Sequence, residues 1–133
     1  LLDRIDLHID MPAVSIEDLQ SEEIGESSAV IRARVEKART YQKARFDALA
    51  TGQKHKVNAA LDDEILRQVA TPDAAGKSLL EKSATKFNLS ARGYHRILRL
   101  ARTIADLEEA DHVKAHHIAE AIAYRKITVA QAA

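Results

Sequence analysis

The fold is decided by residues 88–125, which read NLSARGYHRILRLARTIADLEEADHVKAHHIAEAIAYR. Asn88 tolerates the left-handed conformation that ends many helices, and Ser90 is a preferred N-cap for a following helix. From residue 91 to about residue 109, apolar side chains recur at the spacing of one helix face. They are Tyr94, Ile97, Leu98, Ala101, Ile104 and Ala105. The stretch therefore predicts a tight corner at residues 87–90 and an amphipathic helix over residues 91–109.

Three helices are predicted before this corner. The first is a long basic helix over residues 29–49, capped by Ser27 or Ser28 and ended at Thr51-Gly52. A shorter helix covers residues 62–70. The third starts at Thr71-Pro72-Asp73, with Thr71 as the cap, because proline fits the first helical position and an acid suits the first turn. The expected inward-facing residues are Ile31, Val35, Ala38, Phe46, Leu49, Ile65, Leu66, Val69, Leu79, Leu80, Ala84 and Phe87.

The first residues predict a short strand rather than a helix. Ile5, Leu7 and Ile9 alternate with polar residues, and the pattern stops at Met11-Pro12 because proline cannot donate to a ladder. A lone strand has no partner in this chain, and the sequence starts without an initiator methionine, so we expect it to be part of a longer protein. Residues 13–28 are acidic and serine-bearing, which predicts a solvated connector.

The predicted fold class is therefore all-α, a helical bundle preceded by a short strand remnant. The expected division is a strand remnant over residues 1–12, the connector over 13–28, the helical domain over 29–126 and a frayed tail over 127–133. The last helix of the bundle follows a polar break at residues 110–112 and runs to about Lys126. Its expected inward residues are Ile118, Ala121 and Ile122.

Composition limits the classes of function. The chain has 133 residues, 20 basic and 20 acidic, so it suits one modest domain and has no net charge to attract nucleic acid or a membrane. The absence of cysteine excludes disulfides and thiolate chemistry and favours a cytoplasmic location. No segment has the length or composition of a membrane span or a secretory signal.

Four arginines on the helix over residues 91–109 are candidate anion contacts. Arg92, Arg96 and Arg99 follow the i, i+4, i+7 spacing on the face opposite the apolar one, and Arg102 lies beside them. Like charges at this spacing repel, and the arginine fork matches phosphate oxygens, so the row favours an anionic partner over solvation alone. The alternative is a solvated basic face, to which we assign Arg96 and Arg102; a functional contact is favoured for Arg92, and Arg99 stays undecided.

The segments LLDRIDLHI (residues 1–9), RVEKARTYQKARF (34–46), VNAAL (57–61) and the stretch quoted above resemble the C-terminal region of magnesium-chelatase-like AAA+ ATPases. The bacterial competence-associated branch of that family is the most similar. The resemblance implies a homo-hexameric P-loop ATPase in which a parallel α/β core precedes a helical lid. It implies ATP and magnesium as cofactors of the parent protein and, in the competence-associated relatives, a ring thought to move DNA. Whether the parent remodels DNA or inserts magnesium into a porphyrin stays open.

The same resemblance implies roles for two arginines. Arg4 matches the arginine finger of the family, which reaches a neighbouring subunit's nucleotide, and Arg92 in Ser-Ala-Arg matches the second sensor arginine. A charged planar donor stabilises the charge that spreads over a transferred phosphoryl group, which suits both assignments. Without the resemblance, Arg4 between Asp3 and Asp6 reads as a surface ion pair. Whether Arg92 serves its own or a neighbouring subunit's site stays open.

The chain lacks a G-x-x-x-x-G-K-[ST] loop, so by itself it is expected neither to bind nor to hydrolyse ATP, and to be a monomer. A different class of function is DNA binding through the corner at residues 87–90, with Arg96, Arg99 and Arg102 as contacts, although acids follow directly. A third is a purely structural role in subunit packing. His112 and His116 have a zinc-helix spacing, but no glutamate lies suitably between them, so no metal site is predicted.

Overall fold

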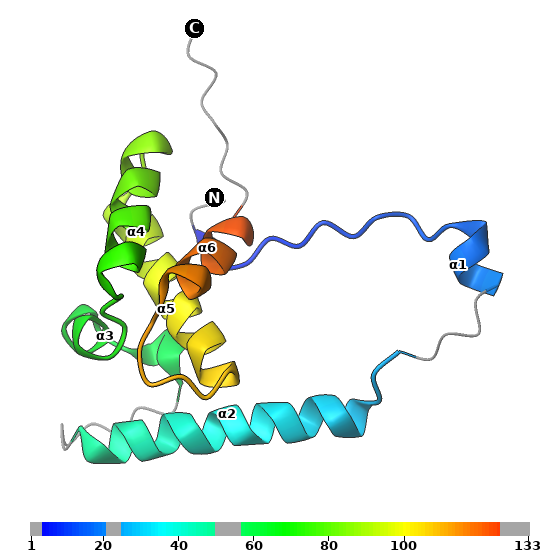
Figure 1. Cartoon of the computed structure of the whole chain (residues 1–133), viewed down its shortest axis with the longest axis horizontal. Helices are drawn as coiled ribbons and strands as arrows, with labels where there is room; N and C mark the ends of the chain where they lie inside the picture. The colour runs from blue at the N-terminus through cyan, green and yellow to red at the C-terminus, as the bar shows by residue number, and fades with distance from the viewer. Residues whose placement is uncertain (1–3, 21–24, 50–56, 126–133) are drawn as a thin grey trace, which may run out of the picture.

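The computed structural model describes residues 4–20, 25–49 and 57–125, and the helices from α2 to α6 form an all-α bundle. The elements are α1 (Ile16–Gln20), α2 (Ser28–Ala48), the 3₁₀ turn η2 (Asn58–Ala60), α3 (Asp63–Val69), α4 (Ala74–Lys86), α5 (Ala91–Leu107) and α6 (Ala115–Ala123). The bundle is arranged around α5, which packs against α2, η2, α3 and α6, while α4 packs against α6 (Figure 1). The prediction of an all-α helical bundle is confirmed.

Side-chain caps fix where most of these helices begin. Ser27, Asp62, Asp73 and Ser90 each accept a hydrogen bond from the backbone N–H three residues ahead. The prediction that Thr71 caps α4 is wrong, because the Asp73 carboxylate takes that bond from Gly76 at 2.7 Å. Pro72 instead lies outside the helix, in an isolated parallel bridge with Val113.

The predicted apolar face of α5 forms the core. Ile97, Leu98, Ala101, Ile104 and Ala105 are buried, as predicted. They pack in one cluster with the other buried apolar residues, which are Phe46, Leu61, Ile65, Leu66, Ala70, Leu80, Val113, Ile118 and Ala121. The corner before α5 also follows the prediction, since Asn88 has a φ of 47° and Ser90 caps the helix. Helix α5 ends slightly earlier than predicted, at Leu107.

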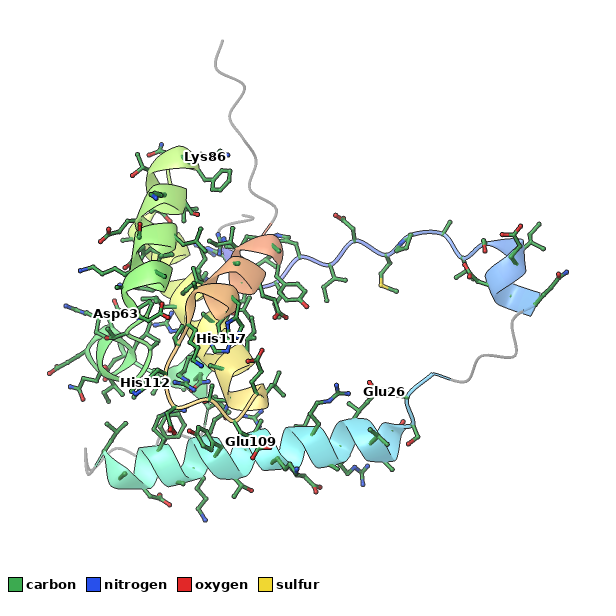
Figure 2. The ribbon with its side chains drawn as sticks, in the orientation of Figure 1. Glu26, Asp63, Lys86, Glu109, His112 and His117 are labelled. Atoms are coloured by element: carbon green, nitrogen blue, oxygen red, sulfur yellow. The ribbon has the colours of Figure 1, made fainter. Side chains whose placement is uncertain are left out.

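Only the second half of α2 belongs to this core. Ala38, Gln42 and Phe46 are buried, whereas Ile31 and Val35 are 45% and 43% exposed, so the prediction that those two face inward is wrong. The helix crosses the bundle and its first half runs beyond it, with Glu26 lying well away from the other helices (Figures 1 and 2). Periodicity identified the apolar face correctly, but α5 is too far from the first half to cover it.

Residues 5–9 do not form a strand among the described residues. The backbone of His8 donates one hydrogen bond, at 2.7 Å, to the carbonyl of Tyr124 just after α6. A strand needs a neighbouring strand for its other donors and acceptors, and the described part of the chain offers none. The predicted helix end at Thr51-Gly52 and the tail over residues 127–133 lie outside the described residues.

A buried carboxylate joins the elements of the bundle. Asp106 of α5 accepts hydrogen bonds from Arg45 of α2 at 2.5 and 2.9 Å, from Asn58 of η2 at 2.8 Å and from Arg102 at 3.0 Å. Burial by itself raises the pKa of Asp106, but the bonds from Arg45 and Asn58 and the charge of Arg102 outweigh it. The pKa of this carboxyl therefore lies below its ordinary value.

Arg102 extends the network to the remaining elements. Its guanidinium donates to the carbonyls of Val69, after which α3 ends, and of Ala110 and Asp111 in the loop before α6. The side chain is completely buried, and burial lowers its pKa while Asp106 opposes that change. These bonds leave a guanidinium inside the bundle with both its charge and its donors satisfied.

Replacing Asp106 with asparagine should lower the free energy of unfolding by about 3–5 kcal/mol, because the buried guanidinium of Arg102 and the partly buried one of Arg45 lose their counter-charge. Urea titration monitored by circular dichroism measures this. The lowered pKa of Asp106 means that its contribution is present above about pH 3.9 and is lost as the pH falls through the lower folded value. Glu109→Gln is the control, because it breaks only the exposed 3.8 Å pair with Lys37. An equal loss in both variants would contradict a dominant role for Asp106.

Candidate phosphate-contacting site

Arg92 lies in the first turn of α5 and is exposed. The Ser90 hydroxyl accepts from the Gly93 N–H at 3.0 Å, and no acidic residue occupies this first turn. Arg92 forms no hydrogen bond or ion pair with any described residue. Its guanidinium is therefore presented to solvent beside the positive end of the helix dipole, where an anion is favoured.

Arg4 is also exposed and has no hydrogen-bond or ion-pair partner among the described residues. It precedes a segment that is held against the bundle at Asp6 and His8. No recorded contact joins Arg4 to Arg92. The structure thus leaves both predicted phosphate-contacting guanidinium groups open, and it does not bring them together.

Arg96 and Arg99 differ from Arg92 because each already has an acidic partner within the chain. Arg96 forms an ion pair with Asp6, and Arg99 donates to the carbonyl of Leu61 at 2.9 Å and to Asp63 at 3.2 Å. Both line a shallow pocket, together with Asp6, Leu7, Ala59 and Thr103. A phosphate or DNA contact at these two arginines stays a prediction, and it would have to compete with the carboxylates present.

The prediction that Arg102 offers a phosphate or DNA contact is wrong. Arg102 has no exposed surface, because it turns into the bundle to pair with Asp106. The spacing i, i+4, i+7 placed the first three arginines correctly on one side of α5. Arg102, three residues beyond Arg99, lies closer to the apolar face, where an acid one turn further on can pair with it.

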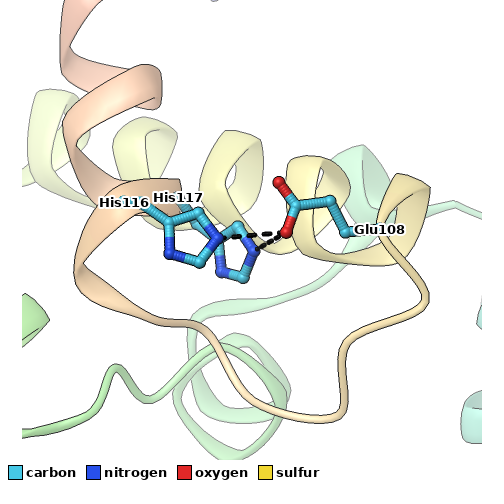
Figure 3. A group of neighbouring side chains, drawn as sticks. All are labelled: Glu108, His116 and His117. Carbon is cyan, nitrogen blue, oxygen red and sulfur yellow. Dashed lines mark hydrogen bonds and ion pairs between the residues drawn. The ribbon is translucent and has the colours of Figure 1, made fainter.

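A second cluster, not predicted from the sequence, joins the end of α5 to the start of α6. Glu108 Oε2 lies 3.0 Å from His116 Nε2 and 2.9 Å from His117 Nε2, as Figure 3 shows. These contacts lower the pKa of Glu108, with His116 contributing more than His117. The three groups lie close enough to be considered as ligands of one metal ion. Local sequence patterns do not predict that Glu108 meets these histidines, because the loop between the two helices decides which acid lies beside them.

The tautomer of His117 opposes a metal at this cluster. His117 is buried, and its Nδ1 accepts the backbone N–H of Lys114 at 2.9 Å. The proton of the neutral ring must then lie on Nε2, from which it is donated to Glu108. A metal-binding histidine instead offers a lone pair at one nitrogen and donates from the other. His117 is therefore better described as a helix cap held by Glu108.

The position of this turn depends on close packing by α4. A side chain at Gly76 would approach the backbone nitrogen of Ala115 to 3.3 Å and Pro72 Cβ to 3.0 Å. Glycine therefore lets α4 lie directly against the start of α6. Figure 2 shows His117 directed into the bundle between the helices, while His112 lies in the loop.

Comparison with known proteins assigns the family. Residues 25–125 match the model described as the C-terminal region of magnesium chelatase, subunit ChlI, and this range covers all the helices from α2 to α6. The chain therefore belongs to the magnesium-chelatase-like AAA+ family, as the resemblance in its sequence indicated.

Two curated relatives extend over most of the chain. The competence protein ComM of Haemophilus influenzae is 38% identical over 125 residues, which cover 93% of this chain and 23% of that protein. The uncharacterized protein YifB of Escherichia coli is 35% identical over 127 residues, covering 95% of this chain and 24% of that protein. The chain thus spans about a quarter of the length of these relatives. Among its described helices, none is long and apolar enough to cross a membrane.

The tautomer of His117 predicts that an equimolar addition of Zn²⁺ leaves the thermal unfolding midpoint of the chain unchanged. Differential scanning fluorimetry measures the midpoint, and the His112→Ala variant controls for weak binding at a surface histidine. A rise in the midpoint that disappears in both Glu108→Gln and His116→Ala would show that the cluster does take a metal ion.

Proposed function

We propose that this chain is the helical lid of an ATP-driven ring, in which Arg4 is the arginine finger for a neighbouring subunit and Arg92 contacts a nucleotide phosphate. One observation carries the proposal. Among the five arginines singled out in the sequence, Arg4 and Arg92 are exposed without an acidic partner in the described chain, whereas the other three are paired internally.

The chemistry of the two positions supports these roles. Holding an exposed arginine without a counter-ion gains nothing for the fold, so its conformational freedom is retained until an external anion binds. A guanidinium brought to a transferred phosphoryl group stabilises the transition state and accounts for about 10³- to 10⁵-fold in rate. At the start of α5, the backbone N–H groups add to the attraction for a phosphate.

The remaining parts of the site belong to protein outside this chain. No phosphate-binding loop occurs in the sequence, so ATP and magnesium would be held by a core similar to that of the full-length relatives. We assign the parent a homo-hexameric ring, in which lid motion follows hydrolysis. The competence protein among the relatives favours DNA over a porphyrin as the substrate of that ring.

DNA binding by the lid alone is the weaker alternative. It relied on Arg96, Arg99 and Arg102 as contacts, and these are tied to Asp6, to Asp63 and to the buried network. A helix that recognises DNA needs side chains that are free to reach base edges or phosphates. Among the arginines of α5, only Arg92 meets that condition, and a single arginine suits contact with one phosphate better than binding of a duplex.

In the full-length ATPase, Arg4→Ala should lower kcat by about 10³-fold, because the transition state loses a charge while ground-state contacts with the nucleotide remain. Steady-state ATP hydrolysis gives kcat, and binding of a fluorescent nucleotide gives the affinity, which should change little. Arg32→Ala is a matched control, since it removes another exposed arginine, on α2. Unchanged turnover in Arg4→Ala would remove the finger assignment.

Arg92→Ala should lower turnover, nucleotide affinity or both by about tenfold or more, because one charged donor to a phosphate is lost. Mixing Arg92→Ala subunits with subunits carrying a disabled phosphate loop tells which protomer's nucleotide Arg92 serves. Partial recovery of hydrolysis in the mixture would require the arginine to act across the interface. Normal hydrolysis by Arg92→Ala alone would contradict any phosphate contact.

A further inference from the structure

The segment that follows Arg4 is attached to the lid at three consecutive residues. The Asp6 carboxylate forms an ion pair with Arg96 of α5. Leu7 lines the pocket that also contains Ala59 and Thr103. The His8 N–H donates to the Tyr124 carbonyl at 2.7 Å. Figure 1 shows the start of the described chain running beside α6.

These attachments differ in kind. The His8 bond uses backbone atoms only and fixes the height of the segment along α6, and Leu7 contributes apolar contact. The ion pair depends on a particular pair of side chains, so substitution of either residue can test it. With the segment in place, the Arg96 side chain is only 18% exposed, so the ion pair is partly shielded from solvent.

We propose that Arg96 is a positioning residue: by pairing with Asp6 it fixes the segment carrying Arg4 onto the lid, so that Arg4 and Arg92 move together as one rigid body. This inference rests on the proposed function of Arg4 and Arg92. Arg96 lies one helical turn after Arg92, and Asp6 lies two residues after Arg4. The pair thus connects the helix that carries Arg92 to the segment that carries Arg4.

The consequence concerns communication between nucleotide sites. If Arg92 contacts the nucleotide and the lid moves when that nucleotide is hydrolysed, a rigid connection transmits the movement of the lid to Arg4 and so to the neighbouring subunit's nucleotide. Coupling of this kind requires an element whose position both sites influence. The lid with its attached segment is such an element. An unattached segment would not transmit movement of the lid to Arg4.

The attachment can be tested on the chain itself, without ATP. The chain contains no cysteine, so a variant with both Arg4→Cys and Glu81→Cys takes nitroxide labels at these two positions and nowhere else. Double electron–electron resonance should give a narrow distance distribution that broadens in Arg96→Ala and narrows again in the charge-reversed pair Asp6→Arg with Arg96→Asp. A reference pair at Glu81→Cys and Ala119→Cys should stay narrow throughout, which shows that the lid remains folded. A distribution that is already broad, or that Arg96→Ala leaves unchanged, would overturn the attachment.

The functional part is tested in the full-length ATPase. Arg96→Ala should lower kcat about tenfold with KM nearly unchanged, because a misplaced finger weakens the transition state more than substrate binding. The charge-reversed pair should recover most of that loss. Arg34→Ala is the matched control, since it breaks an arginine ion pair with Glu26 that lies away from the segment.

The outcomes separate this inference from the proposed function. If Arg4→Ala leaves turnover intact, the finger assignment fails, although the distance measurement can still show the attachment. If Arg4→Ala abolishes turnover but Arg96→Ala matches Arg34→Ala, or charge reversal restores nothing, the positioning role of Arg96 is overturned while the finger assignment stands.

Discussion

Asp106 keeps a negative charge inside the bundle because donors from different elements surround it. Arg45 comes from α2, Asn58 from η2 and Arg102 from α5 itself, and Arg102 also binds carbonyls at the end of α3 and in the loop before α6. A buried carboxylate without these donors would cost several kcal/mol. The elements therefore cannot move apart independently, since each supplies a group that another needs. The arrangement of the lid depends on this constraint more than on any single apolar contact.

The same constraint explains why the arginines of α5 have different environments. Once Asp106 and Arg102 face inward, Arg99 is left beside Asp63, and Arg96 meets the incoming segment at Asp6. Only Arg92, at the start of the helix, has no acid within reach among the described residues. Spacing alone made these side chains look equivalent. Arg96, Arg99 and Arg102 are paired with the carboxylates of Asp6, Asp63 and Asp106, whereas Arg92 faces outward without one.

Much of the bundle could be predicted from local chemistry. The corner at Asn88 and Ser90 and the buried face of α5 follow from capping preference and periodicity, which act within a few residues. Ile31 and Val35 show the limit, because periodicity defines an apolar face but not what covers it. The burial of Arg102 did have a signal, an aspartate four residues later beside the apolar face. The contacts of Glu108 with His116 and His117 had no such signal in the sequence, since they depend on the path of the loop between α5 and α6.

Attachment of the N-terminal segment also bears on how a helical lid can act on chemistry that it does not contain. In the proposed function, the helical lid has no phosphate-binding loop of its own and influences hydrolysis through the position of its arginines. The buried ionic network joins α5 to the other elements, and the Asp6 ion pair joins α5 to the segment next to Arg4; the proposed coupling of Arg92 and Arg4 rests on these two connections. Rigidity is useful here because an arginine contributes to a transition state only when it is held in place. The charges that stabilise the fold therefore also determine where the unpaired ones are directed.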